Sequence, residues 1–216
     1  MTMKTIQVNN TLPKVFAGQT GIHSDVWHKS LTLERGKRYL ISAESGTGKS
    51  SLCSYIYGYR RDYSGTIAFD GQDITALTVA QWCEMRQRHI AYLPQDMRLF
   101  DELTAMENVE LKNRLTGFKT RSEIEELFGT LNIPDKMNSL ASKLSIGQKQ
   151  RVAIIRALCQ PYDFIILDEP VSHLDDENNR IVASLVTREA DKQGAAVIAT
   201  SVGNHLQMEV DVRLNL

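Results

Sequence analysis

Four short apolar runs divide the chain and predict buried β-strands. They lie at residues 38–43, 89–94, 164–168 and 195–200, and read RYLISA, HIAYLP, FIILD and AAVIAT. Within each run the apolar residues are continuous rather than alternating with polar ones. Strands with this pattern are covered on both faces, as in a parallel sheet between layers of helices. The pattern therefore predicts an α/β molecule with a mostly parallel central sheet.

Helical patterns occupy segments between these runs. One helix is expected directly after Gly48. A second is expected near Thr120, which forms the sequence pattern of a capping box with Glu123. A third is expected to begin at Ser145 and to end before Pro161, because proline cannot continue a helix.

Two longer segments complete the predicted organisation. Residues 4–35 have the pattern of antiparallel strands joined by polar turns, and residues 97–143 carry mainly helical signals. We therefore expect one domain over residues 1–216. A core and a β subdomain would take about residues 1–96 and 151–216, and a helical subdomain about residues 97–150.

Composition narrows the choice of function without deciding it. With 42% hydrophobic and 24% charged residues among 216, the chain can bury a sizeable core. Its net charge of −1 gives no reason to expect a nucleic-acid partner. Three scattered cysteines without a CxxC pair disfavour a disulfide framework or a zinc site and fit a reducing cytosol. The sequence has no signal-peptide core and no membrane-spanning run, so we expect any membrane role to depend on a partner.

The segment GTGKSS, Gly46 to Ser51, lies between a predicted strand and a predicted helix. Small residues allow several backbone N–H groups to converge on a phosphate, and the positive end of the following helix adds to the attraction. Lys49 would reach the phosphates and Ser50 would coordinate Mg²⁺. The other interpretation, a glycine turn with a solvated lysine, fits the order of strand, loop and helix less well. The residues expected to contact the nucleotide are Glu44, Ser45, Gly46, Thr47, Gly48, Lys49, Ser50 and Ser51.

Ala43 departs from the phosphate-loop pattern GxxxxGK[ST], which has glycine at this first position. Alanine has the smallest side chain of any residue other than glycine. We therefore expect a mild restriction of the loop rather than loss of the site.

A second motif, FIILDEP, ends a predicted buried strand with two carboxylates. The carboxyl end of such a strand lies at the ligand-binding edge of an α/β sheet. Asp168 would hold Mg²⁺, and Glu169 would polarise the attacking water as a general base. Taken alone, the two acids could equally end a strand in solvent, but the phosphate loop in the same chain favours the catalytic interpretation.

A third motif, KLSIGQKQRVAIIRAL, has two interpretations. Ser145 and Gln148 form a capping-box pattern, so the segment could be an ordinary buried helix with a good N-terminus. A helix N-terminus with a serine hydroxyl and the N–H of Gly147 is also an anion site. If these groups face the γ-phosphate held by another molecule, the helix becomes half of an intermolecular clamp.

With these motifs in this order, the chain resembles, over essentially its whole length, the ATPase subunit of an ATP-binding cassette (ABC) transporter. The matching features are the phosphate loop, Gln95 in AYLPQD as the Q-loop, LSIGQ as the signature, IILDEP followed by the D-loop SHLD, and a final strand. The resemblance implies a P-loop NTPase (RecA-like) core with an antiparallel β subdomain and a helical subdomain insertion. It also implies a head-to-tail dimer that holds two ATP molecules between one copy's phosphate loop and the other's signature.

The resemblance also assigns roles to individual residues. Gln95 would contact the metal and the attacking water and report to the helical subdomain. Asp175 would lie in the D-loop that faces the dimer partner. Phe16 lies at the distance upstream of Lys49 where the family has an aromatic residue that stacks on adenine, although it could instead be a core residue. The metal-binding residues would be Ser50, Gln95 and Asp168, and the residues serving the partner's ATP would be Ser145, Gly147 and Gln148.

Besides Ala43, three positions depart from the family pattern. Ile146 stands where a glycine is usual, and His173 where a small D-loop residue is usual. The departure with chemical weight is Ser201, which takes the catalytic position of a histidine that contacts the γ-phosphate. His205 lies four residues on and could substitute for it only if Gly203 lets the loop fold back. Serine cannot place an imidazole at the phosphate, so we expect ATP binding to be retained and hydrolysis to be slower.

The resemblance implies an ATP-hydrolysing subunit that dimerises on ATP and drives a separate integral membrane permease from the cytoplasmic face of the membrane. ATP and Mg²⁺ would be its cofactors, and no nucleic-acid partner is expected. The branch that it resembles includes lipoprotein-release, macrolide-export and cell-division ATPases. The segment after Gln95 carries apolar residues that would dock the permease or pack on the helical subdomain: Met97, Leu99, Phe100 and Leu103.

Two other functions remain open from the sequence. One is a nucleotide-gated clamp that binds ATP and dimerises but hydrolyses ATP poorly, and Ser201 motivates it. The other is an ABC protein that acts on DNA or the ribosome. The second is disfavoured because such proteins usually carry paired cassettes or long coiled-coil insertions, which this sequence lacks.

Overall fold

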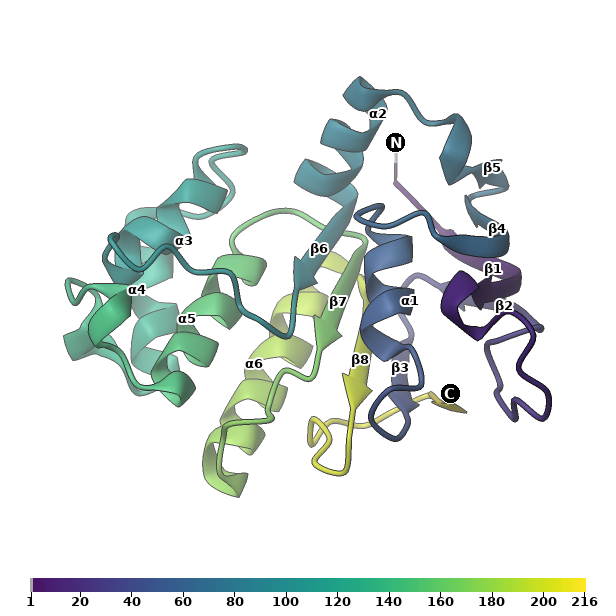
Figure 1. The fold of residues 1–216 in the computed structure, drawn as a ribbon. Coiled ribbons are helices and arrows are strands. Elements are labelled where there is room, and N and C mark those ends of the chain that lie inside the picture. The colour runs from purple at the N-terminus through teal and green to yellow at the C-terminus, as the bar shows by residue number, and fades with distance from the viewer. Residues whose placement is uncertain (1) are drawn as a thin grey trace.

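The computed structural model describes residues 2–216. Within them, a five-stranded parallel sheet runs through the middle of the molecule (Figure 1). The strand order is β6-β7-β8-β3-β9, and every neighbouring pair is parallel. The four strands predicted from apolar runs are confirmed to within two residues at each end. The fifth, β9, was not predicted. The bounds are β3 (Arg38–Ser42), β6 (Ile90–Leu93), β7 (Phe164–Asp168), β8 (Ala196–Ser201) and β9 (Val212–Asn215).

A second sheet of four strands, β2-β1-β4-β5, is antiparallel and lies to one side of the first (Figure 1). Its strands are β1 (Thr5–Pro13), β2 (Ser30–Glu34), β4 (Tyr63–Phe69) and β5 (Gln72–Asp73). The predicted antiparallel pairing within residues 4–35 is confirmed for β1 and β2. Residues 14–29 between them form a 3-10 turn and a loop instead of strand.

Six α-helices within the described residues complete the fold. Of these, α3, α4 and α5 lie together on the opposite side of the parallel sheet from the antiparallel one (Figure 1). The capping boxes predicted at Thr120 and Ser145 are both present. The helices are α1 (Lys49–Ile56), α2 (Val79–Glu84), α3 (Ala105–Asn113), α4 (Arg121–Thr130), α5 (Ile146–Leu158) and α6 (Asp176–Gln193). Short 3-10 turns lie at Lys14–Phe16, Ile74–Ala76, Pro134–Lys136 and Ala141–Lys143, and a π-helical turn at Met85–His89.

The two faces of the parallel sheet belong to two separate cores. Along β7, Ile165 and Leu167 join the core that includes α5 and α6, whereas Phe164 and Ile166 join the core that includes α1 and the antiparallel sheet. Side chains alternate between the faces of a strand, so both sets must be apolar when both faces are covered. This explains why the strand sequences are continuous apolar runs. None of the helices within residues 2–216 combines the length and apolarity needed to span a membrane.

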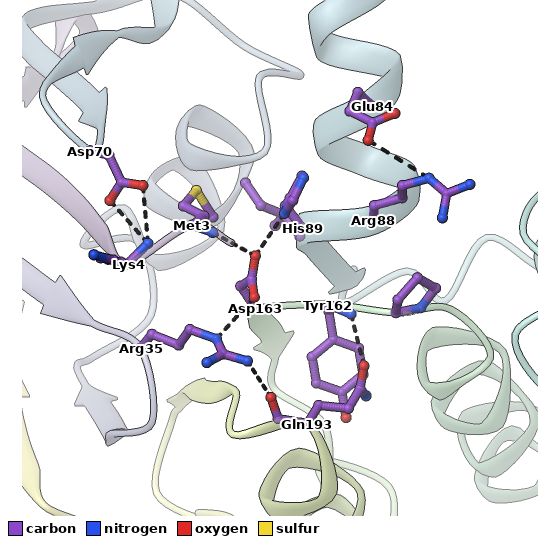
Figure 2. A network of polar contacts seen from close by, with 12 residues as sticks. Met3, Lys4, Arg35, Asp70, Glu84, Arg88, His89, Tyr162, Asp163 and Gln193 are labelled. Carbon is purple, nitrogen blue, oxygen red and sulfur yellow. Dashed lines mark hydrogen bonds and ion pairs between the residues drawn. The ribbon is translucent and has the colours of Figure 1, made fainter. Parts of the chain in front are cut away.

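A buried carboxylate fixes the edge of the sheet where the parallel strands begin. Asp163 directly precedes β7 and accepts a hydrogen bond from the backbone N–H of Met3 at 2.8 Å (Figure 2). It also lies 2.7 Å from Nδ1 of His89 and forms an ion pair with Nε of Arg35 at 2.9 Å. Arg35 in turn donates to the carbonyl of Gln193. One side chain thus joins the residues before β1, the β2–β3 turn and the π-helical turn, and Arg35 extends the link to the end of α6.

Candidate functional site

The phosphate loop joins β3 to α1. Gly46 and Gly48 have φ values of +84° and +101°, in the left-handed region that glycine tolerates. Ala43 has no positive φ, so alanine fits this backbone without strain. Its N–H donates to the carbonyl of Ser201 at 3.3 Å. Substitution of the usual first glycine therefore leaves the loop conformation compatible with phosphate binding.

Lys49 is buried at the first position of α1, and its ammonium folds back onto the loop. Nζ donates to the carbonyls of Ala43 at 3.2 Å and Glu44 at 2.7 Å. These contacts use two of its three N–H donors. The hydroxyl of Thr47 also donates to the Glu44 carbonyl, at 2.9 Å. Farther along α1, the Ser51 hydroxyl accepts from Arg60 at 3.0 Å.

The two acids lie at the end of β7: Asp168 is its last residue and Glu169 follows it. Asp168 is 1% exposed, and its Oδ1 accepts a hydrogen bond from the Thr200 hydroxyl at 2.8 Å. The same hydroxyl accepts from the backbone N–H of Glu169 at 3.2 Å. Glu169 itself has φ +52°, an uncommon conformation for a residue with a side chain. Thr200 on the neighbouring strand thus holds both acids in place.

A chain of side-chain contacts brings three predicted site residues together. The Ser50 hydroxyl donates to Oε1 of Gln95 at 3.4 Å, and Nε2 of Gln95 donates to Oε2 of Glu169 at 3.2 Å. Ser50 comes from α1, Gln95 from the loop after β6 and Glu169 from the loop after β7. All three line a pocket of about 410 Å³ together with Lys49, Gly46, Gly48, Ser45, Ser51, Phe16, Val15 and Arg60.

This pocket has the donors and acceptors that a magnesium nucleotide requires. Its lining supplies hydroxyl, amide and carboxylate oxygens, the ligands that Mg²⁺ prefers, from Ser50, Gln95 and Glu169. Asp168 does not line the pocket and lies buried beside it, 1% exposed. A Cβ added at Gly46 would meet no atom within 4 Å, so space remains beside the loop. Burial raises the pKa of the Cys53 thiol behind the loop, so this group stays neutral.

Phe16 lies beside the loop, as its predicted stacking role requires. It is partly buried, lines the phosphate pocket and packs on the core beneath it. A Cβ added at Gly48 would approach Phe16 to 3.2 Å and Trp27 to 3.0 Å. The stacking and core interpretations of Phe16 are therefore compatible.

Comparison with known proteins gives the family. Residues 27–172 match the family model described as ABC transporter. An uncharacterized ABC transporter ATP-binding protein of Mycobacterium tuberculosis is 32% identical over 209 residues, which are 95% of this chain and 63% of that protein. This chain belongs to the ABC transporter ATP-binding family. It spans slightly less than two thirds of the mycobacterial relative.

Other relatives agree with the predicted branch and fold. The lipoprotein-releasing system ATP-binding protein of Shewanella denitrificans is 29% identical to this ABC chain, over 96% of the chain and 90% of the relative. Among solved structures, a dimeric bacterial ABC transporter cassette matches with a TM-score of 0.76 and 26% identity, over 90% of this chain and 87% of that one. The P-loop NTPase fold expected from the resemblance is thus confirmed.

The signature of this ABC chain lies at the start of α5 and does not line the phosphate pocket of the same chain. The Ser145 hydroxyl accepts from the Gln148 N–H at 3.3 Å, and Oε1 of Gln148 accepts from the Ser145 N–H at 2.9 Å. Ile146, which replaces the family glycine, is 53% exposed. A Cβ added at Gly147 would lie 3.1 Å from the carbonyl of His173, so the signature and the D-loop are in contact. The His173 side chain is exposed, as expected of a surface variation.

Ser201 differs slightly from its expected place. The structure extends β8 by one residue, so Ser201 ends the strand rather than following it, and it is 3% exposed. Its carbonyl supports Ala43 in the phosphate loop. His205 is exposed, and its backbone carbonyl accepts a hydrogen bond from the Asn179 side chain. Within residues 2–216 the His205 imidazole makes no hydrogen bond.

Sequence reasoning missed three residues that shape the ABC site. Thr200 positions both acids, and Trp27 contacts the phosphate loop. Gln150 is buried in α5, donates to the carbonyl of Glu169 at 3.1 Å and accepts from the N–H of His173 at 3.1 Å. The register that pairs Asp168 with Thr200 could have pointed to Thr200 once the strands were aligned. Gln150 and Trp27 have no sequence pattern that distinguishes them.

Proposed function

We propose that this ABC subunit binds and hydrolyses ATP with Mg²⁺ at the pocket beside Lys49. The contacts that join Ser50, Gln95 and Glu169 carry the proposal. They bring a metal-binding hydroxyl, a water-orienting amide and a general base together at one phosphate loop. A glycine turn that only precedes a helix would not need Ser50, Gln95 and Glu169 to lie beside it.

Each residue has a defined task in the proposed reaction. Lys49 and the loop N–H groups would hold the phosphates, and Ser50, Gln95 and Asp168 would hold Mg²⁺. When bound, Mg²⁺ neutralises charge on the phosphate oxygens. Glu169 accepts a proton from the attacking water, which Gln95 helps to orient. Thr200 keeps Glu169 and Asp168 in their relative positions.

Two copies are proposed to complete each site. At this helix N-terminus Ser145 is exposed and Gly147 half-buried, neither lines its own chain's pocket, and the N–H groups can be presented to an anion. The similarity to a dimeric cassette supports the head-to-tail arrangement. Residues Ser145, Gly147 and Gln148 would then contact the partner's ATP, with the D-loop residue Asp175 beside them.

Ser201 supports a second candidate, a clamp that closes on ATP and opens slowly. The buried serine reaches the phosphate loop only through its carbonyl, and the His205 imidazole has no contact that would place it there. One contact to the transition state is therefore absent, which slows hydrolysis more than it weakens binding.

The second partner is proposed to be an integral membrane permease, which would place the subunit on the cytoplasmic face of the membrane. A groove of about 300 Å³ between the core and the helical subdomain would receive it. Its residues are Tyr57, Tyr59, Tyr92, Pro94, Arg98, Phe100, Leu111, Lys112, Arg156 and Ala157. Phe100 is 56% exposed, whereas Met97 and Leu99 pack on the helical core.

The groove is cationic as well as aromatic. Burial and, to a smaller extent, the charges of the neighbouring Arg156 and Arg86 lower the pKa of Lys112 to about 8. None of the described residues that line the groove is acidic, although Arg98 pairs with Asp96 just outside it. We therefore expect the docking segment of the permease to carry a carboxylate beside apolar side chains.

Steady-state hydrolysis of Mg-ATP tests the proposed activity. Turnover should rise with protein concentration, because two copies form each site, and Glu169→Gln should slow it by about 10²–10⁴-fold. Retained ATP binding without measurable turnover would favour the clamp. Absence of ATP binding would contradict both functions.

Membrane fractionation in the native host tests the docking groove. Phe100→Asp should release the protein from the membrane fraction while its ATP affinity is unchanged. Val79→Asp is the matched control, since Val79 is 82% exposed on α2, away from the groove. Equal membrane association of both variants and the wild type would place docking elsewhere.

A further inference from the structure

Trp27 makes a contact with the phosphate loop that no motif explains. Its side chain is 2% exposed, and its indole Nε1–H donates to the carbonyl of Thr47 at 3.0 Å. The ring also lies against the next residue, since a Cβ added at Gly48 would be 3.0 Å from Cζ2 of Trp27. Trp27 therefore contacts two consecutive residues of the loop.

The hydrogen bond fixes the orientation of one peptide group. No peptide bond within residues 2–216 is cis, and in a trans peptide the C=O and the following N–H point in opposite directions. Because the Thr47 carbonyl points to Trp27, the Gly48 N–H points away from Trp27. Gly48 is also a lining residue of the nucleotide pocket.

This peptide group needs such a restraint. Gly46 and Gly48 both have positive φ, and glycine exchanges readily between positive and negative φ. Rotation of the Thr47–Gly48 peptide would turn its carbonyl oxygen toward the pocket. That oxygen would repel a phosphate, whereas the N–H attracts one.

We propose that Trp27 is a positioning residue that holds the Thr47–Gly48 peptide with its N–H facing the nucleotide phosphates. This assignment rests on the proposed ATP binding. It adds Trp27, which lies outside the phosphate loop, to the residues that support that binding. The hydroxyl of Thr47 provides a second restraint through the Glu44 carbonyl. Trp27 acts on the peptide itself, through its carbonyl oxygen.

The chain offers a matched control in its other tryptophan. Trp82 is also buried, at 5% exposure, but its Nε1 has no hydrogen-bond partner within residues 2–216. Phenylalanine at either position keeps an aromatic ring and removes an indole N–H. Both variants lose similar packing, but only Trp27→Phe loses a donor to the phosphate loop.

Calorimetric titration of Mg-ATP into both variants tests the proposal. Trp27→Phe should weaken ATP binding by about three- to tenfold, the range expected for loss of one hydrogen bond. Trp82→Phe should bind like the wild type, even if both variants melt at a lower temperature. Equal ATP affinity in all three proteins would overturn the role of Trp27.

Nuclear magnetic resonance of the nucleotide-free protein gives a second readout that does not need ATP binding. The Gly48 amide should give one sharp signal in the wild type and in Trp82→Phe, and a broadened or doubled signal in Trp27→Phe. A sharp, single Gly48 signal in Trp27→Phe would overturn the proposal even if the affinity fell. Failure of the wild type to bind ATP would instead overturn the proposed function, and this signal would still test the restraint.

Discussion

At the scale of single residues, the last two residues of β8, Thr200 and Ser201, contact the site in different ways. Thr200 donates to Asp168 and accepts from Glu169, so one hydroxyl holds both the proposed metal ligand and the proposed general base. The next residue, Ser201, contacts the phosphate loop through its backbone alone. Thr200 therefore retains a supporting role at the site, whereas Ser201 lacks the imidazole that the family pattern has at its position.

Replacement of Ser201 by histidine should raise ATP turnover. An imidazole at this position would supply the missing contact to the γ-phosphate, and a gain of about tenfold corresponds to about 1.4 kcal/mol of transition-state stabilisation. Ser201→Asn, which has similar bulk without an imidazole, is the control in the same steady-state assay. Turnover no higher than in the asparagine variant would show that another group already fills the role.

At the scale of elements, a buried ion pair joins the start of α4 to α6. Lys119, just before α4, lies 2.7 Å from Glu189 on α6, and the two side chains are 7% and 4% exposed. Lys192 and Arg188 add further contacts to the same carboxylate. In the groove on the other side of the subdomain, Lys112 donates to the carbonyl of Arg86 without a carboxylate beside it.

Glu189→Gln should destabilise the fold by about 3–5 kcal/mol, because it leaves the Lys119 ammonium buried without a countercharge. Urea unfolding at pH 7 measures this loss. The double variant Lys119→Met, Glu189→Leu should be clearly more stable than Glu189→Gln, since it removes both charges. If the double variant were the less stable protein, the ion pair would contribute more than its desolvation costs.

The lowered pKa of Lys112 predicts that the stability of the fold changes at alkaline pH. Its folded-state pKa of about 8 lies below the unfolded value of 10.5, so between these values the unfolded chain binds more protons. Its contribution to stability therefore rises as pH increases from 8 to 10.5. Lys112→Met lacks this titration, so urea unfolding should show the wild type gaining stability relative to the variant over that window. Parallel curves for the two proteins would contradict the lowered pKa.

At the scale of the whole molecule, local signals made most of the fold predictable. Continuous apolar runs located the buried strands, and the capping boxes at Thr120 and Ser145 located two helix starts, because each signal lies within a few residues. The strand β9 was missed since it is short and mostly not buried. The phosphate loop could be predicted for the same local reason, whereas the Trp27 and Gln150 contacts join segments that only the folded chain brings together.

Glu169→Gln should trap a dimer on Mg-ATP, because slow hydrolysis leaves the ATP bridge between two copies intact. Light scattering after size exclusion measures the mass. Adding Ile146→Asp should restore the monomer, since it places a negative charge at the exposed start of α5, where the partner's phosphates would lie. A monomer in both variants at saturating Mg-ATP would argue against the sandwich.

The contact of Trp27 with the phosphate loop also gives the protein an optical signal of its own. The chain has two tryptophans, so Trp82→Phe leaves a single indole, with its N–H on Thr47 and its ring beside Gly48. The emission of that one fluorophore reports the surroundings of the loop directly. Filling and emptying of the site in the purified protein could thus be followed in real time with natural, unlabelled nucleotide.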